Sequence, residues 1–564
     1  MNLYKNILVP AIGGTISSKK IDIDYNKYKI VRFNNNVNFY LNKISEDIEA
    51  KYYHYDESYM LWTGGFGKNF DLKSFDVNNY EDKFIFFSLK NKELKIFSDH
   101  YSRIPLYFYH NECGFYFSTS MKMLLTMIPD NQTIIDFESV LFYYNYGFPR
   151  FNNLLVKHIK SLPPSQNITI NVDQNTYKSA VYRNYYNPNP IIQSNSLKQN
   201  SVFFNDSLFK STKIILDDFN KIGISISGGV DSGYIAQKIK QCGKKFYSYT
   251  VGYKNAYNEF DRVDLLSSKL NFKVKKIIVD EKDIIDNFIE CSEISSTPVY
   301  FNNSILNFVY EAASNDSIDV MFDGDGVDRV FLGSNGHVRL NFILKLYLVL
   351  KRLNLNYLFP KFLTIINVNK LNPLKYYFNS MSQGYPFHGE RQLSKFKNYS
   401  YEFEKHLNSI SLPEELKSYM GNNHWLYYTL FGLYYFSNCF LHNQYELQLS
   451  KGIIANPHYW KDSLLDIALN TPTNQKLFFM NTKRVVREAA SINLNSKYWN
   501  LKKRGLDNAF QYIKNTSYGN DFINSIESEI KKSEEFLYLS ETMPHEEIDP
   551  SRLISYYFWK KNLI

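Results

Sequence analysis

The sequence predicts a protein of mixed class, in which an antiparallel β-sheet domain (α+β) is followed by a parallel α/β domain with a helical extension. Three observations support this prediction. Short runs with alternating apolar residues fill the chain up to residue 186. Strand-like and helix-like segments then alternate as far as residue 323. From residue 338 to residue 564 the pattern is mostly helical.

The first region, residues 1–186, consists of strand-like runs separated by polar turns. Clear examples are residues 83–88, 94–98, 106–109 and 114–118. Alternation with a period of two places apolar side chains on one face of a sheet, so we expect stacked antiparallel sheets. Residues 187–201 are rich in Asn, Ser and Pro and are predicted to be a linker.

The second region, residues 202–564, begins with a regular alternation of elements. Strands are expected near residues 222–227, 246–252, 274–279 and 318–323. Helices are expected near residues 203–220, 231–242, 261–271 and 302–315. This rhythm is typical of an open parallel sheet with helices on both faces, in which ligands bind beyond the carboxyl ends of the strands.

Composition excludes several classes of protein. A length of 564 residues suggests two or three domains, and an apolar fraction of 44% is ample for their cores. The net charge of +9 is spread along the chain, so no nucleic-acid partner is expected. The most lipophilic stretch, residues 340–363, is interrupted by Lys345, Lys351, Arg352 and Lys361, which favours an amphipathic helix over a membrane span and over a membrane-surface role.

The cysteines suggest a reducing compartment. Four of them, Cys113, Cys242, Cys291 and Cys439, are scattered without C-x-x-C or His/Cys pairing, so neither a disulfide framework nor a zinc site is indicated. The first residues lack a basic region followed by an apolar run. We therefore expect a cytoplasmic protein.

A glycine-rich loop follows the strand that begins at Ile222. Gly228 and Gly229 allow a close approach of the backbone to an oxyanion, and Ser227 and Ser232 add hydroxyl donors. Asp231 would repel phosphates unless a divalent cation lay between them, so it is interpreted as a Mg²⁺ ligand. The alternative is an ordinary β-turn-α junction in which the glycines only make a tight turn.

A second polar loop, Asp323-Gly-Asp-Gly-Val-Asp-Arg329, follows the apolar strand that ends at Phe322. Three carboxylates at a strand end are not a feature of a hydrophobic core. A solvated acidic turn is one alternative. A calcium loop is another, although the twelfth position lacks the Glu of an EF-hand. Beside the first loop, we favour a nucleotide site to which Gly324, Asp325 and Asp328 contribute.

The glycine-rich loop and the acidic loop together resemble those of the asparagine synthetase family. The family's motifs occur here in order as Ser227–Ser232, Tyr249–Tyr253, Asn258–Asp261, the acidic loop, Lys483-Arg-Val-Val-Arg-Glu-Ala489 and Lys503-Arg-Gly-Leu506. Residues 98–108 and 117–125 resemble its glutaminase domain. The resemblance implies a class II amidotransferase-type β-sandwich at the N-terminus and an adenine-nucleotide α-hydrolase-like synthetase domain that uses ATP and Mg²⁺.

The same resemblance assigns roles to individual residues. Asp231 and Asp328 would hold Mg²⁺ on the pyrophosphate of ATP, with Ser227, Gly228, Gly229, Ser232 and Gly324 beside the nucleotide. Asp325 falls where the family places an acid near the path of the nucleophile. Lys503, or its neighbour Lys502, would stabilise the charge that develops at the reacting centre.

Two departures from the family pattern point to the substrate. Members that use glutamine need a cysteine directly after the initiator methionine, but residue 2 is Asn and no cysteine precedes Cys113. We therefore expect a degenerate glutaminase domain without glutamine hydrolysis. The family phrase Glu-x-Arg-x-Pro is replaced by Ile454-Ala-Asn-Pro-His458, so aspartate is not the expected substrate.

An enzyme that activates a carboxylate without making ammonia can take the amine from its own substrate. Lasso-peptide cyclases and β-lactam synthetases are similar enzymes with this loss. We favour macrolactam formation in a ribosomal precursor peptide, with a leader peptidase and a leader-binding protein as expected partners. The alternatives are an ammonia-dependent amidotransferase that acts on a sugar or small carboxylate, a β-lactam-synthetase-like cyclase, and a non-catalytic scaffold.

Overall fold

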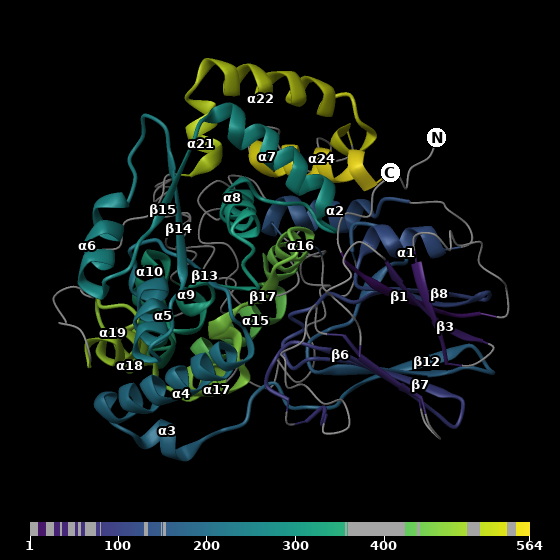
Figure 1. The fold of residues 1–564 in the computed structure, drawn as a ribbon, viewed down its shortest axis with the longest axis horizontal. Coiled ribbons are helices and arrows are strands. Elements are labelled where there is room, and N and C mark those ends of the chain that lie inside the picture. The colour runs from purple at the N-terminus through teal and green to yellow at the C-terminus, as the bar shows by residue number, and fades with distance from the viewer. Residues whose placement is uncertain are drawn as a thin grey trace.

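The computed structural model of the chain describes residues 10–17, 28–33, 36–42, 51–54, 58–62, 75–78, 80–128, 134–147, 149, 154–355, 358, 423–436, 440–492, 508–537 and 549–563. Two regions of different architecture make up this part of the chain (Figure 1). The N-terminal region is rich in strands, and the larger second region surrounds a parallel sheet with helices.

The N-terminal region contains two six-stranded antiparallel sheets, ordered β10-β8-β9-β1-β3-β2 and β12-β11-β7-β6-β5-β4. The strands are β1 (Ile12–Ile16), β2 (Tyr28–Arg32), β3 (Val37–Asn42), β4 (Lys51–His54), β5 (Ser58–Trp62), β6 (Ile85–Lys90), β7 (Glu93–Ser98), β8 (Tyr107–Asn111), β9 (Gly114–Ser118), β10 (Lys160–Ser161), β11 (Gln166–Asn171) and β12 (Thr176–Val181). Helices α1 (Met121–Met127) and α2 (Phe137–Tyr146) complete the region.

The two sheets lie face to face (Figure 1), and apolar side chains that alternate along their strands pack between them. The ring of Phe39 lies 5.0 Å from that of Phe87 in the opposite sheet, and the rings of Phe87 and Phe117 are 5.3 Å apart. All three side chains are fully buried. The prediction of stacked antiparallel sheets is therefore confirmed, and the four predicted runs correspond to β6, β7, β8 and β9.

The second region is built on a five-stranded parallel sheet of order β15-β14-β13-β16-β17. Its strands are β13 (Ile222–Ser225), β14 (Tyr247–Tyr253), β15 (Lys275–Val279), β16 (Val320–Phe322) and β17 (Ile454–Asn456). The first four are close to the predicted positions. The prediction missed β17 within the mostly helical part, because a three-residue strand acquires its structure only by pairing with β16.

Helices surround this sheet on both faces (Figure 1). On one side α4, α5 and α19 pack together, and on the other α7, α8 and α16 do so. The helices are α3 (Pro190–Ser194), α4 (Leu197–Asp218), α5 (Val230–Gln241), α6 (Phe260–Leu270), α7 (Glu281–Ile294), α8 (Phe301–Asn315), α9 (Val327–Val330), α10 (Asn335–Arg352), α15 (His424–Phe436), α16 (His442–Ser450), the 3₁₀ turn His458–Trp460, α17 (Asp462–Asn470), α18 (Thr473–Lys476), α19 (Arg484–Ser491), α21 (Ala509–Lys514), α22 (Ser517–Ile530) and α24 (Pro550–Leu563).

The predicted linker is partly helical. Within residues 187–201, α3 occupies the middle and α4 begins at Leu197. Ser196 caps α4 by accepting a hydrogen bond from the backbone N–H of Gln199, and the Gln199 side chain accepts one from the Ser196 N–H. This reciprocal capping box starts a helix in a segment of low apolar periodicity, which is why the composition was misleading.

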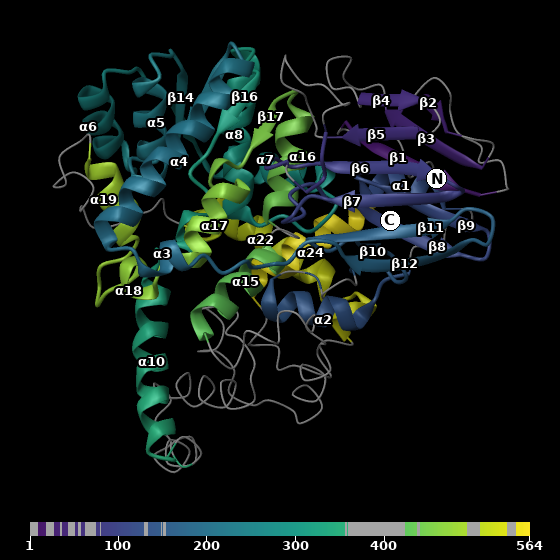
Figure 2. The same cartoon turned by 90° about the horizontal axis from the view of Figure 1, so that it is seen from below.

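Helix α10 extends away from the rest of the described chain (Figure 2). It buries Leu340, Leu344 and Tyr347, while Phe342 on another side is exposed. This pattern agrees with an amphipathic helix. Nowhere in the described ranges is there a helix with enough length and apolar character to cross a membrane.

Candidate active site

The strand order of the parallel sheet reverses between β13 and β16. Connections from the two strands therefore leave in opposite directions and open a crevice at their carboxyl ends, where open α/β sheets bind ligands. The glycine-rich loop follows β13, and the acidic loop follows β16. The fold thus brings the two predicted site loops to neighbouring strand ends.

The first loop is shaped by Gly228 and Gly229. Gly228 has a φ of 70°, and a Cβ there would lie 2.7 Å from the Cβ of Arg262, so both the conformation and the space require glycine. Gly229 is the N-cap of α5 and makes no side-chain cap, which leaves backbone N–H groups directed at the loop. Ser232 accepts a hydrogen bond from the Ser227 N–H at 3.2 Å and braces the turn.

The two loops touch one another. A Cβ on Gly324 would lie 2.8 Å from the backbone nitrogen of Ser232 and 3.1 Å from the Cβ of Asp231. Tyr459, which follows β17, donates a hydrogen bond to the Asp231 carbonyl at 2.9 Å. A glycine at position 324 therefore allows the acidic loop to pack on the start of α5.

Asp231 and Asp328 converge on one cation. The ammonium of Lys483 lies 2.5 Å from Asp231 Oδ2 and 2.6 Å from Asp328 Oδ1. Burial disfavours the charged lysine, but the two carboxylates outweigh burial and raise the pKa of Lys483. The carboxylates remain 20% and 37% exposed, whereas the lysine side chain is 3% exposed. The site is thus open on the carboxylate side.

Asp325 lies on the other side of the acidic loop. Its Oδ2 accepts a hydrogen bond from the side-chain amide of Gln444 at 2.5 Å, and its backbone N–H donates to Asp323 Oδ1 at 3.1 Å. Burial, reinforced by the neighbouring Asp325, raises the pKa of Asp323 well above its usual range. Asp323 therefore favours its neutral form beside Asp325.

The donor set suits a hard divalent cation that takes its remaining ligands from phosphate and water. Two carboxylates face one point already occupied by a positive charge, and oxygen is the ligand that Mg²⁺ prefers. Among the described residues, no group of three or more His, Cys, Asp or Glu side chains could hold a metal alone. The assignment of Asp231 and Asp328 as magnesium ligands stays a prediction.

Some predicted residues lie elsewhere. Lys503 and Lys502 fall outside the described residues. The aromatic residues Trp425 and Tyr428 of α15 are buried together in one core cluster. His458 is fully buried against Thr212 at 2.9 Å, and burial lowers its pKa to about 3, which indicates a structural role.

Sequence reasoning missed Lys483, Gln444 and Tyr459 as site residues. Lys483 was visible as the first residue of a motif, and its place before a helix start was the available signal. Gln444 and Tyr459 carry no local signal, since each reaches a loop more than a hundred residues away through tertiary packing.

A family model described as asparagine synthase matches residues 204–543, well over half of the chain. The chain belongs to the asparagine synthase family. Asparagine synthetase [glutamine-hydrolyzing] 1 of Bacillus subtilis (strain 168) is 23% identical over 240 residues, which are 41% of this chain and 36% of the relative. A putative counterpart from Methanocaldococcus jannaschii is 24% identical over 202 residues, 34% of this chain and 36% of the relative. The chain thus spans little more than a third of the length of these relatives.

Two solved structures match segments of the chain. An NH3-dependent NAD synthetase from Campylobacter jejuni is 14% identical, with a TM-score of 0.19 over 41% of this chain and 94% of that one. The U34-tRNA thiolase NcsA from Methanococcus maripaludis is 17% identical, with a TM-score of 0.19 over 27% and 56%.

Proposed function

We propose that the chain is an ATP-dependent ligase that adenylates a carboxylate, releases pyrophosphate and passes the acyl group to an amine. The convergence of Asp231, Asp328 and Lys483 beside the glycine-rich loop carries this proposal, because that set can hold a polyphosphate and neutralise it. Membership of the asparagine synthase family supports the same reaction class.

Each residue of the site has its own role in the proposed reaction. Backbone N–H groups from Ser227 to Asp231 bind phosphate oxygens, and Lys483 stabilises the charge that develops as pyrophosphate leaves. When bound at Asp231 and Asp328, Mg²⁺ would neutralise the phosphates of ATP. The Asp325 carboxylate, held by Gln444, accepts the proton of the attacking amine. Lys503 is retained as a candidate for stabilising the acyl centre.

For the substrate, we propose a ribosomal precursor peptide that is closed into a macrolactam. Its Asp or Glu side chain would be adenylated, and its own N-terminal amine would attack. One feature is in line with an internal amine. Cys113 lies in the β8–β9 turn, where its carbonyl accepts a hydrogen bond from the Ser17 hydroxyl, so it does not have the free α-amine of an N-terminal nucleophile. Holding both groups of one chain together provides an effective molarity of about 10⁵ M or more.

A panel of synthetic peptides tests this proposal. Each peptide has a free N-terminal amine and one Asp or Glu at successive positions. Incubation with ATP and Mg²⁺ should release pyrophosphate and yield a product lighter by one water. Acetylation of the amine should abolish the product but leave adenylation. Pyrophosphate release without any amide would contradict the cyclisation.

An ammonia-dependent reaction is the second candidate, favoured by the relatives of the chain, which are asparagine synthetases. ATP and ammonium with small amino or sugar acids would then give a simple amide in the absence of peptide. That result would exclude the peptide proposal.

A further inference from the structure

Helix α16 (His442–Ser450) is polar in sequence but buried along its length. Asn443, Gln444, Glu446 and Gln448 are all 3% exposed or less. Burying polar side chains costs free energy unless each finds a partner. The partners of α16 therefore show what this helix connects.

On one side, α16 contacts the N-terminal sheet region. His442 Nε2 donates a hydrogen bond to the carbonyl of Ser102 at 2.6 Å. The indole N–H of Trp62, at the end of β5, donates to the hydroxyl of Tyr445 at 3.0 Å. Both bonds are buried and join residues more than three hundred positions apart, so they fix the helix against the N-terminal region.

On its other side, α16 faces the acidic loop. Gln444 donates to the Asp325 carboxylate, and Gln448, one turn later, lines the same small cavity as Asp323. The side chains of residues 444 and 448 lie on the same face of a helix because they are four positions apart. One face of α16 thus lies against Asp323 and Asp325 and holds the carboxylate of Asp325.

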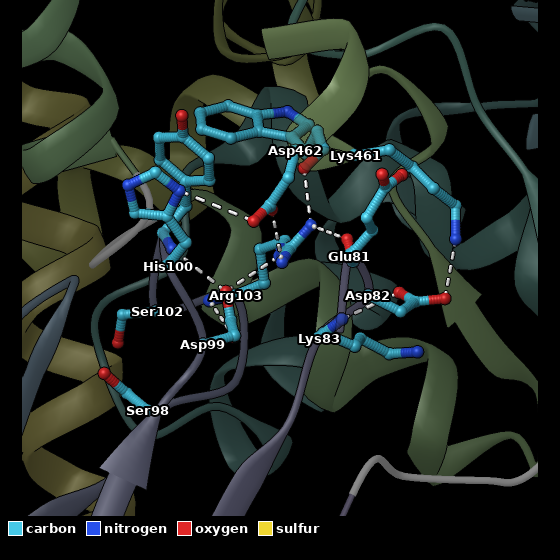
Figure 3. A network of polar contacts seen from close by, with 12 residues as sticks. Glu81, Asp82, Lys83, Ser98, Asp99, His100, Ser102, Arg103, Lys461 and Asp462 are labelled. Atoms are coloured by element: carbon cyan, nitrogen blue, oxygen red, sulfur yellow. Dashed lines mark hydrogen bonds and ion pairs between the residues drawn. The ribbon is translucent and has the colours of Figure 1, made fainter. Parts of the chain in front are cut away.

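The space behind Gln444 is closed by the N-terminal region. Lys83 and Arg103 of that region, Gln444 and Gln448 of α16, and Asp323 line a cavity of about 10 Å³, which admits about one water molecule. Figure 3 shows Arg103 bonded to Asp99 and Asp462. Gln444 is therefore closed to bulk water on this side, whereas Asp325 itself stays partly exposed.

We propose that α16 is the element through which the N-terminal region positions the carboxylate of Asp325, with Gln444 as the positioning residue. This inference rests on the proposed function of Asp325 as proton acceptor. A hydrogen bond donated to a carboxylate favours its ionised form and restricts its rotation. The N-terminal region therefore serves amide formation by holding the acceptor, without touching the reacting atoms.

Gln444→Leu removes the donor with little change in volume. It should lower kcat for amide formation about 10-fold, a part of the 10²–10⁴-fold that a positioned base contributes. Pyrophosphate release in adenylation should be unchanged. The acidic limb of the kcat–pH profile should move up by about one unit, because the ionised Asp325 loses its donor. Gln444→Glu should move the limb further, since it places a second carboxyl beside Asp325.

A matched control is Gln475→Leu. Gln475 is also a buried glutamine, but its amide binds Asn195 and Asn200. The Gln475→Leu variant should keep the acidic limb of the kcat–pH profile for amide formation at its wild-type position. An unshifted limb and an unchanged kcat in Gln444→Leu would overturn the positioning role.

A second measurement needs no substrate. Gln444→Glu should lower the unfolding temperature more at pH 8 than at pH 5, and adding Asp325→Asn should restore it at pH 8. Failure of Asp325→Asn to restore stability would contradict the contact itself. If the wild-type protein turns over no peptide or ammonium, the proposed function fails, and this stability cycle alone then decides whether Gln444 holds Asp325.

Discussion

Two buried cations in this protein, Arg103 and Lys483, each bridge a pair of carboxylates, but only the carboxylates around Lys483 are open to solvent. Arg103 contacts Asp99 at 2.8 Å and Asp462 at 3.0 Å, and all three side chains are 2% exposed or less (Figure 3). Arg103 also donates to the carbonyls of Trp460 and Glu81. This cluster is closed to solvent and joins the N-terminal region to the start of α17.

Lys483 shows the contrasting case. It is equally buried, but Asp231 and Asp328 retain exposed carboxylate surface. An ammonium is a point charge with three donors and no fixed fork, whereas the guanidinium is planar and bidentate. The comparison teaches that exposure of the acids, rather than of the base, separates a site that can exchange partners from a permanent structural contact.

The largest effect on stability is expected for Arg103→Met, which removes the cation of the closed cluster. It leaves Asp99 and Asp462 buried without their shared cation, so the free energy of unfolding should fall by about 3–5 kcal/mol in chemical denaturation. Lys92→Met is the control, because Lys92 pairs with Asp173 on the surface. An equal loss in both variants would refute the distinction between buried and exposed pairs.

The buried contact between Glu446 and Ser296 should make the stability of the protein depend on pH. Burial raises the pKa of Glu446 from 4.5 to about 7, although hydrogen bonds from Ser296 lower it. A raised carboxyl pKa stabilises the fold fully below pH 4.5, and this contribution of about 3 kcal/mol is lost as the pH rises through 7. Glu446→Gln should remove that loss. Parallel stability–pH curves for both proteins would contradict it.

At the open site the expected effect is on chemistry. Asp231→Asn or Asp328→Asn should lower pyrophosphate release by at least ~100-fold, with little change in unfolding. Asp264→Asn, in the exposed pair with Lys276, is the matched control and should retain activity. Full turnover in either site variant would refute the metal assignment.

The smallest effect is expected for Tyr445→Phe. It removes the acceptor of the Trp62 N–H while keeping the ring, so stability should fall by about 1 kcal/mol. Amide formation should slow less than in Gln444→Leu, because the helix loses only one of its two anchors in the N-terminal region. If Tyr445→Phe slowed amide formation more than Gln444→Leu does, Gln444 would not be the residue of α16 that matters most for positioning Asp325.

Much of this architecture was predictable because it is encoded locally. The strands around Ile222 and Phe322 have continuous apolar runs, and Gly228 supplies a backbone conformation that other residues rarely adopt. The placement of Asp231 and Asp328 at neighbouring strand ends followed from the parallel α/β rhythm. The short strand β17 and the early start of α4 were missed, since one depends on a distant partner and the other on a single cap.

The sequence by itself determined the two loops, their order and the alternation that builds the sheet, because periodicity and glycine chemistry act over a few residues. Only the tertiary structure decided that Lys483 lies between the two acids and that Gln444 holds Asp325. These contacts join residues 119 to 252 positions apart, and local sequence does not say which residues pair over such a separation.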